Sequence, residues 1–199
     1  MTAATRARGR PRDPALDAVI LQTARELLVS DGYAALTMDA VATRAGVTKP
    51  TVYRRWPNKR LLIWEATYGK SAKAELPDSG SIDEDLRTVL RWGVEEVTAP
   101  EARASIAGML SDLQADPALR RLVLDRLLEP EYARIQTVLQ RAIDREQLRS
   151  DCDLDLLMDA LIGAVLTRAV LFEHPLNEAF IVGLVDVLVN GARPAATAT

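Results

Sequence analysis

Apolar residues recur at spacings of three and four along almost the whole chain, and this periodicity constrains the fold more than any other feature of the sequence. Side chains spaced in this way lie on one face of an α-helix, whereas a half-buried strand needs an alternation of apolar and polar residues. That alternation is almost absent. We therefore expect an all-α protein of about nine helices.

The first helix is expected to have Asp13 as its N-cap and Pro14 at its first position, and to stop near Gly32. An Asp side chain can accept a hydrogen bond from a free backbone N–H of the first turn, and a proline at the first position loses no such bond. One stripe of this helix is predicted to be buried, formed by Leu16, Val19, Ile20, Leu27 and Leu28.

Two shorter helices follow, joined by a tight turn at Ala45-Gly46-Val47. The first begins after Thr37 as its N-cap and ends at Gly46, whose freedom to adopt a left-handed backbone suits the turn. The second runs from about Thr48 to Trp56. Two short helices joined in this way are the helix-turn-helix pattern, in which the second helix can lie in the major groove of DNA.

Further helix signals divide the rest of the chain. Ser81 with Glu84 has the spacing of a capping box, and Pro130 must kink or split the long helix in which it falls. The expected starts after the loop at 76–80 are Ser81 for a fifth helix, Pro100 for a sixth and Asp116-Pro117 for a long seventh, and two late helices cover about 153–172 and 177–190.

Charge is distributed unevenly along the sequence. Residues 1–60 carry 11 Lys and Arg against 5 Asp and Glu, and the remaining 139 residues carry 14 against 23, so the net charge of -3 combines +6 with -9. A basic first third is the electrostatic pattern expected of nucleic-acid binding, although charge also fluctuates along any chain. The acidic remainder argues against a general affinity for polyanions.

A set of spaced residues around the turn resembles the DNA-binding domain of TetR-family transcriptional regulators. The resemblance covers roughly residues 13–68. The sequence departs from the family pattern at Pro50, where glycine is frequent, at Arg55, where histidine or tyrosine is frequent, and at Trp56, which replaces phenylalanine. The matching residues are Gly32-Tyr33, Thr37, Ala42, Ala45-Gly46-Val47, Tyr53, Trp56, Lys59 and Leu62.

This resemblance implies a homodimer that binds double-stranded operator DNA and responds to a small-molecule effector. A repressor released by its effector is favoured, and an activator stays open. The implied organisation is a flexible basic arm over 1–12, a helix-turn-helix domain over 13–60, a fourth helix over 59–75 as connector, a ligand-binding and dimerisation domain over 76–193, and a disordered tail over 194–199.

Candidate DNA contacts lie on and around the third helix. Resemblance to the family implies phosphate contacts for Thr37, Tyr53 and Lys59, beside the capping, packing or solvated roles that these side chains can also have. From their place on that helix, Lys49 can donate to guanine and Thr51 can contact a thymine methyl. The full set is Thr37, Thr48, Lys49, Thr51, Tyr53, Arg54, Arg55 and Lys59. The two adjacent arginines cannot both face the core, so at least one faces DNA or water.

The segment Arg8-Gly9-Arg10-Pro11-Arg12 is a second DNA-binding signal, because it resembles the core of an AT-hook. In such a strip the arginines fit the narrow, strongly negative minor groove of A/T-rich DNA. Its position immediately before a helix-turn-helix domain would let Arg8, Arg10 and Arg12 enter the groove beside the recognition helix. A solvated basic tail is the alternative.

The acidic body is expected to hold the effector pocket and the dimer interface. An aromatic and Met-bearing lining would suit a hydrophobic or aromatic effector, although ordinary core packing also explains these residues. Candidate pocket residues are Trp64, Tyr68, Trp92, Met109, Leu113, Tyr132 and His174, and candidate interface residues on the last two helices are Leu157, Ala160, Leu161, Ala164, Thr167, Phe180, Leu184 and Val187. An intramolecular core is the alternative for the second group.

Several classes of protein are disfavoured by the sequence. No apolar run approaches the roughly 20 residues that span a bilayer, and the single cysteine, Cys152, cannot form an intrachain disulfide, so we expect a cytoplasmic protein without a membrane partner. No P-loop, nucleotide-binding glycine pattern or nucleophile elbow indicates an enzyme, and no cofactor is expected. The alternative to a regulator is an architectural A/T-rich DNA-binding protein without operator specificity.

Overall fold

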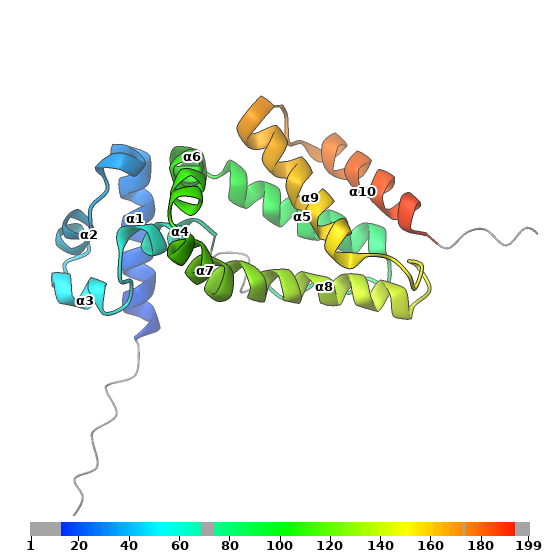
Figure 1. Cartoon of the computed structure of the whole chain (residues 1–199), viewed down its shortest axis with the longest axis horizontal. Helices are drawn as coiled ribbons and strands as arrows, with labels where there is room; N and C mark the ends of the chain where they lie inside the picture. The colour runs from blue at the N-terminus through cyan, green and yellow to red at the C-terminus, as the bar shows by residue number, and fades with distance from the viewer. Residues whose placement is uncertain (1–12, 69–73, 173, 194–199) are drawn as a thin grey trace, which may run out of the picture.

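The structure is a computed structural model of the chain, and it describes residues 13–68, 74–172 and 174–193. Every regular element in these ranges is a helix, as the periodicity predicted (Figure 1). In chain order the helices are α1 (Pro14–Ala35), α2 (Met38–Arg44), α3 (Lys49–Tyr53), α4 (Lys59–Tyr68), α5 (Ile82–Thr98), α6 (Pro100–Ala115), α7 (Pro117–Val123), α8 (Glu129–Asp144), α9 (Leu154–Leu166) and α10 (Glu178–Ala192).

Two π-helical segments connect or extend these elements. One covers Leu124–Leu128 and joins α7 to α8, and the other covers Thr167–Phe172 and extends α9. Pro130 falls in the first turn of α8, where its missing N–H costs little. The prediction that this proline splits a long seventh helix is therefore confirmed, and the segment from α7 to α8 accounts for the expected ninth helix.

The start of α1 is as predicted, but one face of it is not. Asp13 accepts a hydrogen bond from the Ala15 N–H at 3.0 Å, and Gly32 interrupts the helix with φ at 80°. Val19, however, is 49% exposed. Because α1 packs on α4 and α6, its buried stripe runs through Ile20, and Val19 lies about 100° around the helix from that stripe.

The expected capping box at Ser81 is also corrected by the structure. Ser81 occupies the N-cap position of α5, but its side chain makes no capping hydrogen bond. Instead, the Ile82 N–H donates to the Gln147 side-chain oxygen at 3.0 Å, and the buried Asp85 carboxylate accepts from the Ser79 N–H at 2.9 Å. Partners distant in sequence thus replace the local cap.

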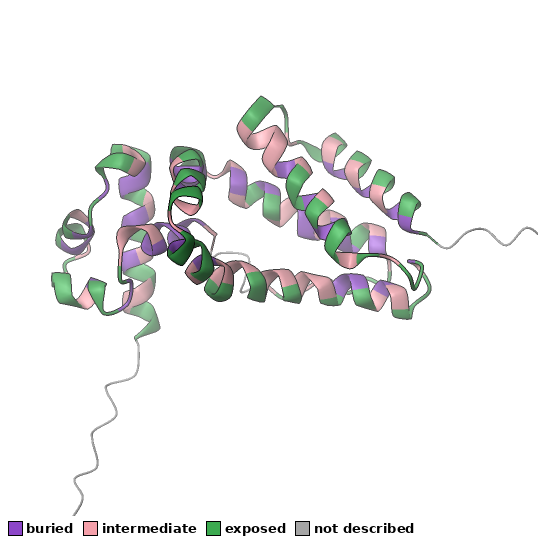
Figure 2. Ribbon diagram, in the orientation of Figure 1, coloured by how far each residue is buried: buried purple, intermediate pink, exposed green. Residues whose placement is uncertain are grey.

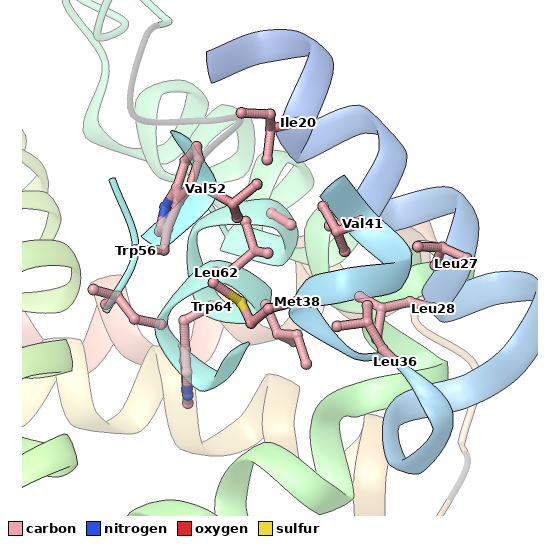
Figure 3. Close-up of a cluster of buried hydrophobic side chains, with 14 of the residues drawn as sticks. Ile20, Leu27, Leu28, Leu36, Met38, Val41, Val52, Trp56, Leu62 and Trp64 are labelled. Atoms are coloured by element: carbon pink, nitrogen blue, oxygen red, sulfur yellow. The ribbon is translucent and has the colours of Figure 1, made fainter. Parts of the chain in front are cut away.

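Two hydrophobic cores organise the described residues. The first lies at the end of the molecule that holds α1 to α4, shown in Figure 3, and it continues into the body through Met109 of α6 and Leu119 and Val123 of α7. The second joins α5, α8, α9 and α10. Figure 1 shows α2 and α3 at one end of the molecule and α10 at the other. We refer to α1–α3 as the head and to α5–α10 as the body, with α4 between them.

Membrane insertion finds no support in these helices. In the described part of the chain, none combines the length and the hydropathy that crossing a bilayer would need.

Candidate nucleic-acid interface

The turn between α2 and α3 is fixed by backbone geometry. Gly46 has φ at 67°, in the left-handed region that a side chain would disfavour. The Val47 N–H then donates to the Ala42 carbonyl at 3.0 Å, which closes the end of α2. At the other end of α2 the Thr37 hydroxyl accepts from the Ala40 N–H at 3.1 Å. These bonds set the angle at which α3 leaves the turn.

One side of α3 is anchored in the first core. Val52 is fully buried and Trp56 is 2% exposed, and Figure 3 shows both among the side chains contributed by α1 and α4. The Trp56 indole N–H donates to a Glu65 carboxylate oxygen at 2.6 Å, so the ring cannot rotate without losing a bond to a charged acceptor. The opposite side of α3 is consequently held at the surface.

Arg55 belongs to the anchored side, which corrects its assignment as a DNA contact. Its side chain is 7% exposed, and its guanidinium is paired with Asp17 of α1 and donates to the Thr51 carbonyl at 3.2 Å. A guanidinium satisfied in this way inside the head has no reach to a phosphate. Of the two adjacent arginines, Arg54 is the one that faces solvent.

The outward side of α3 carries most of the remaining candidates. Lys49 forms an ion pair with Asp39 of α2 at 2.7 Å, and this hydrogen bond raises the pKa of the lysine. The Lys49 ammonium lies 5.7 Å from the centre of the Tyr53 ring, and Tyr53 is 42% exposed. The Thr48 and Thr51 hydroxyls are 2.9 Å apart. Together with Arg54, these side chains form an exposed surface of donors, which we call the α3 surface.

Lys59 occupies a different environment from the one the resemblance implies. Its ammonium donates to the carbonyls of Tyr33 at 3.3 Å, Ala34 at 3.4 Å and Leu36 at 3.3 Å, and it lies 5.4 Å from the centre of the Tyr33 ring. The end of α1 leaves carbonyls without helical partners, and a cation there satisfies them. All three ammonium protons have acceptors in the protein.

The basic segment from Arg8 to Arg12 lies outside the described residues, so the predicted contacts of Arg8, Arg10 and Arg12 remain a prediction.

The head is joined to the body through polar contacts with α6. The Tyr33 hydroxyl donates to the Asp112 carboxylate, and burial followed by this bond raises the pKa of Tyr33. Arg60 of α4 contacts Asp112 at 3.1 Å and Asp116 at 3.0 Å. The Tyr33 ring also covers Gly108, where a Cβ would fall 2.4 Å from ring carbon Cδ1. We call these residues the head–body joint.

The body contains an apolar pocket of about 180 Å³ between α5 and α9. Tyr68 and Trp92 line it, as predicted, and His174 lines a separate recess beside Arg103 and Arg168. The lining residues of the apolar pocket are Tyr68, Val89, Leu90, Trp92, Gly93, Glu96, Val97, Glu131, Ile135, Met158, Leu161, Ile162, Val165 and Leu166.

The other pocket candidates lie elsewhere. Trp64 and Met109 are buried in the first core, Leu113 packs against it, and the Tyr132 hydroxyl donates to the Asp155 carbonyl at 3.0 Å. Aromatic and Met residues were thus poor markers of the pocket, because most fill cores. No group of His, Cys, Asp or Glu in the described ranges is arranged to hold a metal ion.

The predicted interface on α9 and α10 is partly corrected. Leu157 is 8% and Leu161 4% exposed, because both pack inside the second core, whereas Val187 is 70% exposed. Ala160, Ala164, Thr167, Phe180 and Leu184 are of intermediate exposure. Figure 2 shows exposed residues recurring along both helices. The exposed large apolar side chains of this region are Leu156, Ile162, Leu171, Phe172, Val182 and Val187, which we call the α9–α10 face.

Both parts of the chain match known protein families. Residues 20–66 match the family described as bacterial regulatory proteins, tetR family, and residues 76–188 match the one described as tetracyclin repressor-like, C-terminal domain. The DNA-binding transcriptional repressor TetR of Mycobacteroides abscessus is 36% identical over 96% of this chain and 98% of its own length.

Solved structures agree in fold. The crystal structure of the TetR family transcription regulator SCO0332 has a TM-score of 0.75 and 30% identity, over 90% of this chain and 99% of that one. The regulator FadR from Bacillus subtilis, solved in complex with stearoyl-CoA, has a TM-score of 0.62 over 88% of this chain and 99% of its own, at 16% identity, and so shares the fold.

Proposed function

Because the chain belongs to the TetR family of bacterial transcriptional regulators, we propose that it is a repressor that binds a palindromic operator as a homodimer and leaves it when a small molecule enters the body. DNA-binding regulation of transcription is the property of the family, which is one of regulators and not of enzymes. The repressor role, the operator symmetry and the effector are the proposed part.

The observation that carries the proposal is the α3 surface. Lys49, Thr51, Tyr53 and Arg54 project outward from a short helix whose other side is held by Trp56 in the core. Lysine and threonine side chains offer donors to guanine and to base edges, and tyrosine and arginine suit phosphates. A short helix with this surface has the form that the major groove admits.

A homodimer follows from the reach of a single head. One α3 contacts only half of a typical site, and joining two heads raises affinity because the second binding event becomes intramolecular. The α9–α10 face, with Val182 and Val187 exposed, is the surface that we assign to the partner copy. Apolar side chains gathered on one face favour burial against a second copy.

The effector is assigned to the apolar pocket between α5 and α9. Its walls are mostly Val, Leu, Ile and Met side chains, which suit a hydrophobic or aromatic molecule. The related fold of FadR binds stearoyl-CoA, which is also largely apolar. Tyr68, at the end of α4, places the pocket next to the helix that carries the head, so occupancy can change the spacing of the two heads.

Selection of bound fragments from random DNA tests this function. We expect a palindromic consensus that the full-length protein prefers over bulk DNA by at least about a thousandfold. Lys49→Ala should alter the selected bases, whereas Arg44→Ala, an exposed change on α2 outside the α3 surface, should leave them unchanged. Binding that follows A/T content with no palindrome would support an architectural protein instead.

A further inference from the structure

The pocket between α5 and α9 combines apolar walls with two acidic side chains. Glu96 of α5 and Glu131 of α8 both line it, and no Lys, Arg or His is among its described lining residues. A carboxylate placed against an apolar cavity is costly unless a partner compensates its lost hydration. Two of them at one small pocket therefore indicate which charge its ligand should carry.

One guanidinium behind the pocket partly balances these acids. Arg134 donates to the two oxygens of Glu131 at 2.8 and 2.9 Å and to the Ala74 carbonyl at 2.7 Å. The hydrogen bond with Glu131, and further the charge of Glu96, raise the pKa of Arg134. The three side chains together carry one net negative charge. An anion entering the pocket would meet the carboxylates, because the guanidinium is engaged by protein acceptors.

Aromatic rings complete the site. Tyr68 and Trp92 both line the pocket, and the face of an aromatic ring attracts an organic cation. Burial, and then the charge of Glu96, raise the pKa of Tyr68 to about 12, so the phenol stays neutral at physiological pH. A neutral phenol adds no anionic charge of its own, and it keeps its ring available for contact with a cation.

We infer that the effector of this pocket is a lipophilic cation, with an apolar body against the α5 and α9 side chains and an amine or quaternary ammonium group beside Glu96 and Glu131. This inference rests on the proposed function, because it specifies the ligand that the regulator senses. A quaternary ammonium gains both from the carboxylates and from the rings of Tyr68 and Trp92, whereas a neutral molecule gains only from the walls.

Three probes of similar size separate charge from shape. Calorimetric titration of the full-length protein would use benzyltrimethylammonium, its neutral isostere neopentylbenzene, and the anion benzenesulfonate. The inference predicts that the cation binds at least about tenfold more tightly than the neutral isostere and that the sulfonate binds more weakly than both. Equal affinity for cation and isostere, a preference for sulfonate, or no binding of the cation would overturn it.

Variants locate the preference in the pocket. Glu96→Gln should reduce the preference for cation over isostere to less than threefold while the isostere binds as before, since shape is nearly retained. Glu95→Gln is the matched control, because Glu95 is the exposed neighbour on α5 and does not line the pocket. A preference that persists in Glu96→Gln would remove Glu96 from the site and overturn the inference.

Operator binding, measured on the same preparation without ligand, keeps the two proposals apart. It depends on the α3 surface and not on the pocket. A protein that binds its operator but fails the probe test loses the lipophilic cation and keeps its function as a regulator. A protein that passes the probe test but selects no operator keeps the cation site and loses the proposed function.

Discussion

Arg54 and Arg55 are adjacent in sequence and serve opposite sides of α3. Arg55 is packed inside the head against Asp17, whereas Arg54 is exposed. Helical geometry turns neighbouring side chains by about 100°, so only one of two adjacent residues can follow the buried side. The sequence showed that both could not face the core, but the choice between them depended on the position of Asp17 in the folded head.

Replacing each arginine with alanine should separate these roles. Arg55→Ala is expected to lower the free energy of unfolding by about 2 to 3 kcal/mol, because it leaves the Asp17 carboxylate without its partner at 23% exposure. Arg54→Ala should leave stability within about 0.5 kcal/mol of the parent and weaken DNA binding. Urea unfolding measures the first effect. A stable Arg55→Ala protein with weakened DNA binding would return Arg55 to the interface.

Lys59 offers a second test at the scale of one side chain. Since its ammonium donates to three carbonyls at the end of α1, Lys59→Ala should lower the free energy of unfolding by about 1 to 2 kcal/mol. The slope of log affinity against log salt should stay unchanged, because no phosphate contact is removed. A slope reduced by about one would instead establish the phosphate contact that the family resemblance implies.

At the scale of helices, Gly108 shows how closely the head and the body approach. The Tyr33 ring, at the end of α1, lies where a Cβ on Gly108 of α6 would be, and the Tyr33 hydroxyl contacts Asp112 one turn further along. A glycine within α6 costs helix stability, and the ring contact accounts for it. The joint therefore depends on a missing side chain as much as on its ionic contacts.

Gly108→Ala should disturb this joint. The added Cβ would have to displace Tyr33, and we expect a loss of about 1 to 3 kcal/mol in unfolding free energy together with altered operator affinity. Gly93→Ala is the control, since a Cβ there meets no atom within 4 Å and alanine favours a helix. Thermal unfolding of both variants measures the difference. A Gly108→Ala protein as stable as Gly93→Ala would show that Tyr33 shifts without cost.

Element prediction succeeded where the signals were local. Asp13, Thr37, Gly46 and Pro130 act within a turn of their own positions, and the helices begin or break at these residues as expected. The cap of α5 failed because Gln147, far along the chain, supplies the bond instead of Ser81. Local patterns do not contain such partners.

Site prediction divided in the same way. The α3 surface follows from a short motif, so Lys49 and Thr51 could be found from the sequence. The pocket is assembled from four helices, and Glu96 and Glu131 were missed because an acidic residue on a helix is ordinarily solvated. Only the packing of α5 against α8 and α9 brings them to one cavity.

The whole molecule places its basic and acidic parts at opposite ends. The head holds the α3 surface, and the body, where most of the acidic residues lie, holds the α9–α10 face at the other end of the molecule (Figure 2). An acidic body repels the DNA backbone, so a dimer joined through its bodies would present only its heads to the operator. Operator binding and dimer formation should then be separable by variants in the body alone.

Val187→Lys tests that separation. Val187 is 70% exposed on α10, and a charge buried there between two copies would cost enough to dissociate the dimer. We expect a helical monomer in sedimentation and circular dichroism that binds a two-half-site operator at least about a hundredfold more weakly, with unchanged affinity for a single half-site. Leu110→Lys, a change of an exposed apolar residue on α6 outside the face, should remain dimeric. If Val187→Lys sediments as a dimer, α10 does not form the contact between copies, and the spacing of the two heads must be set by another surface of the body.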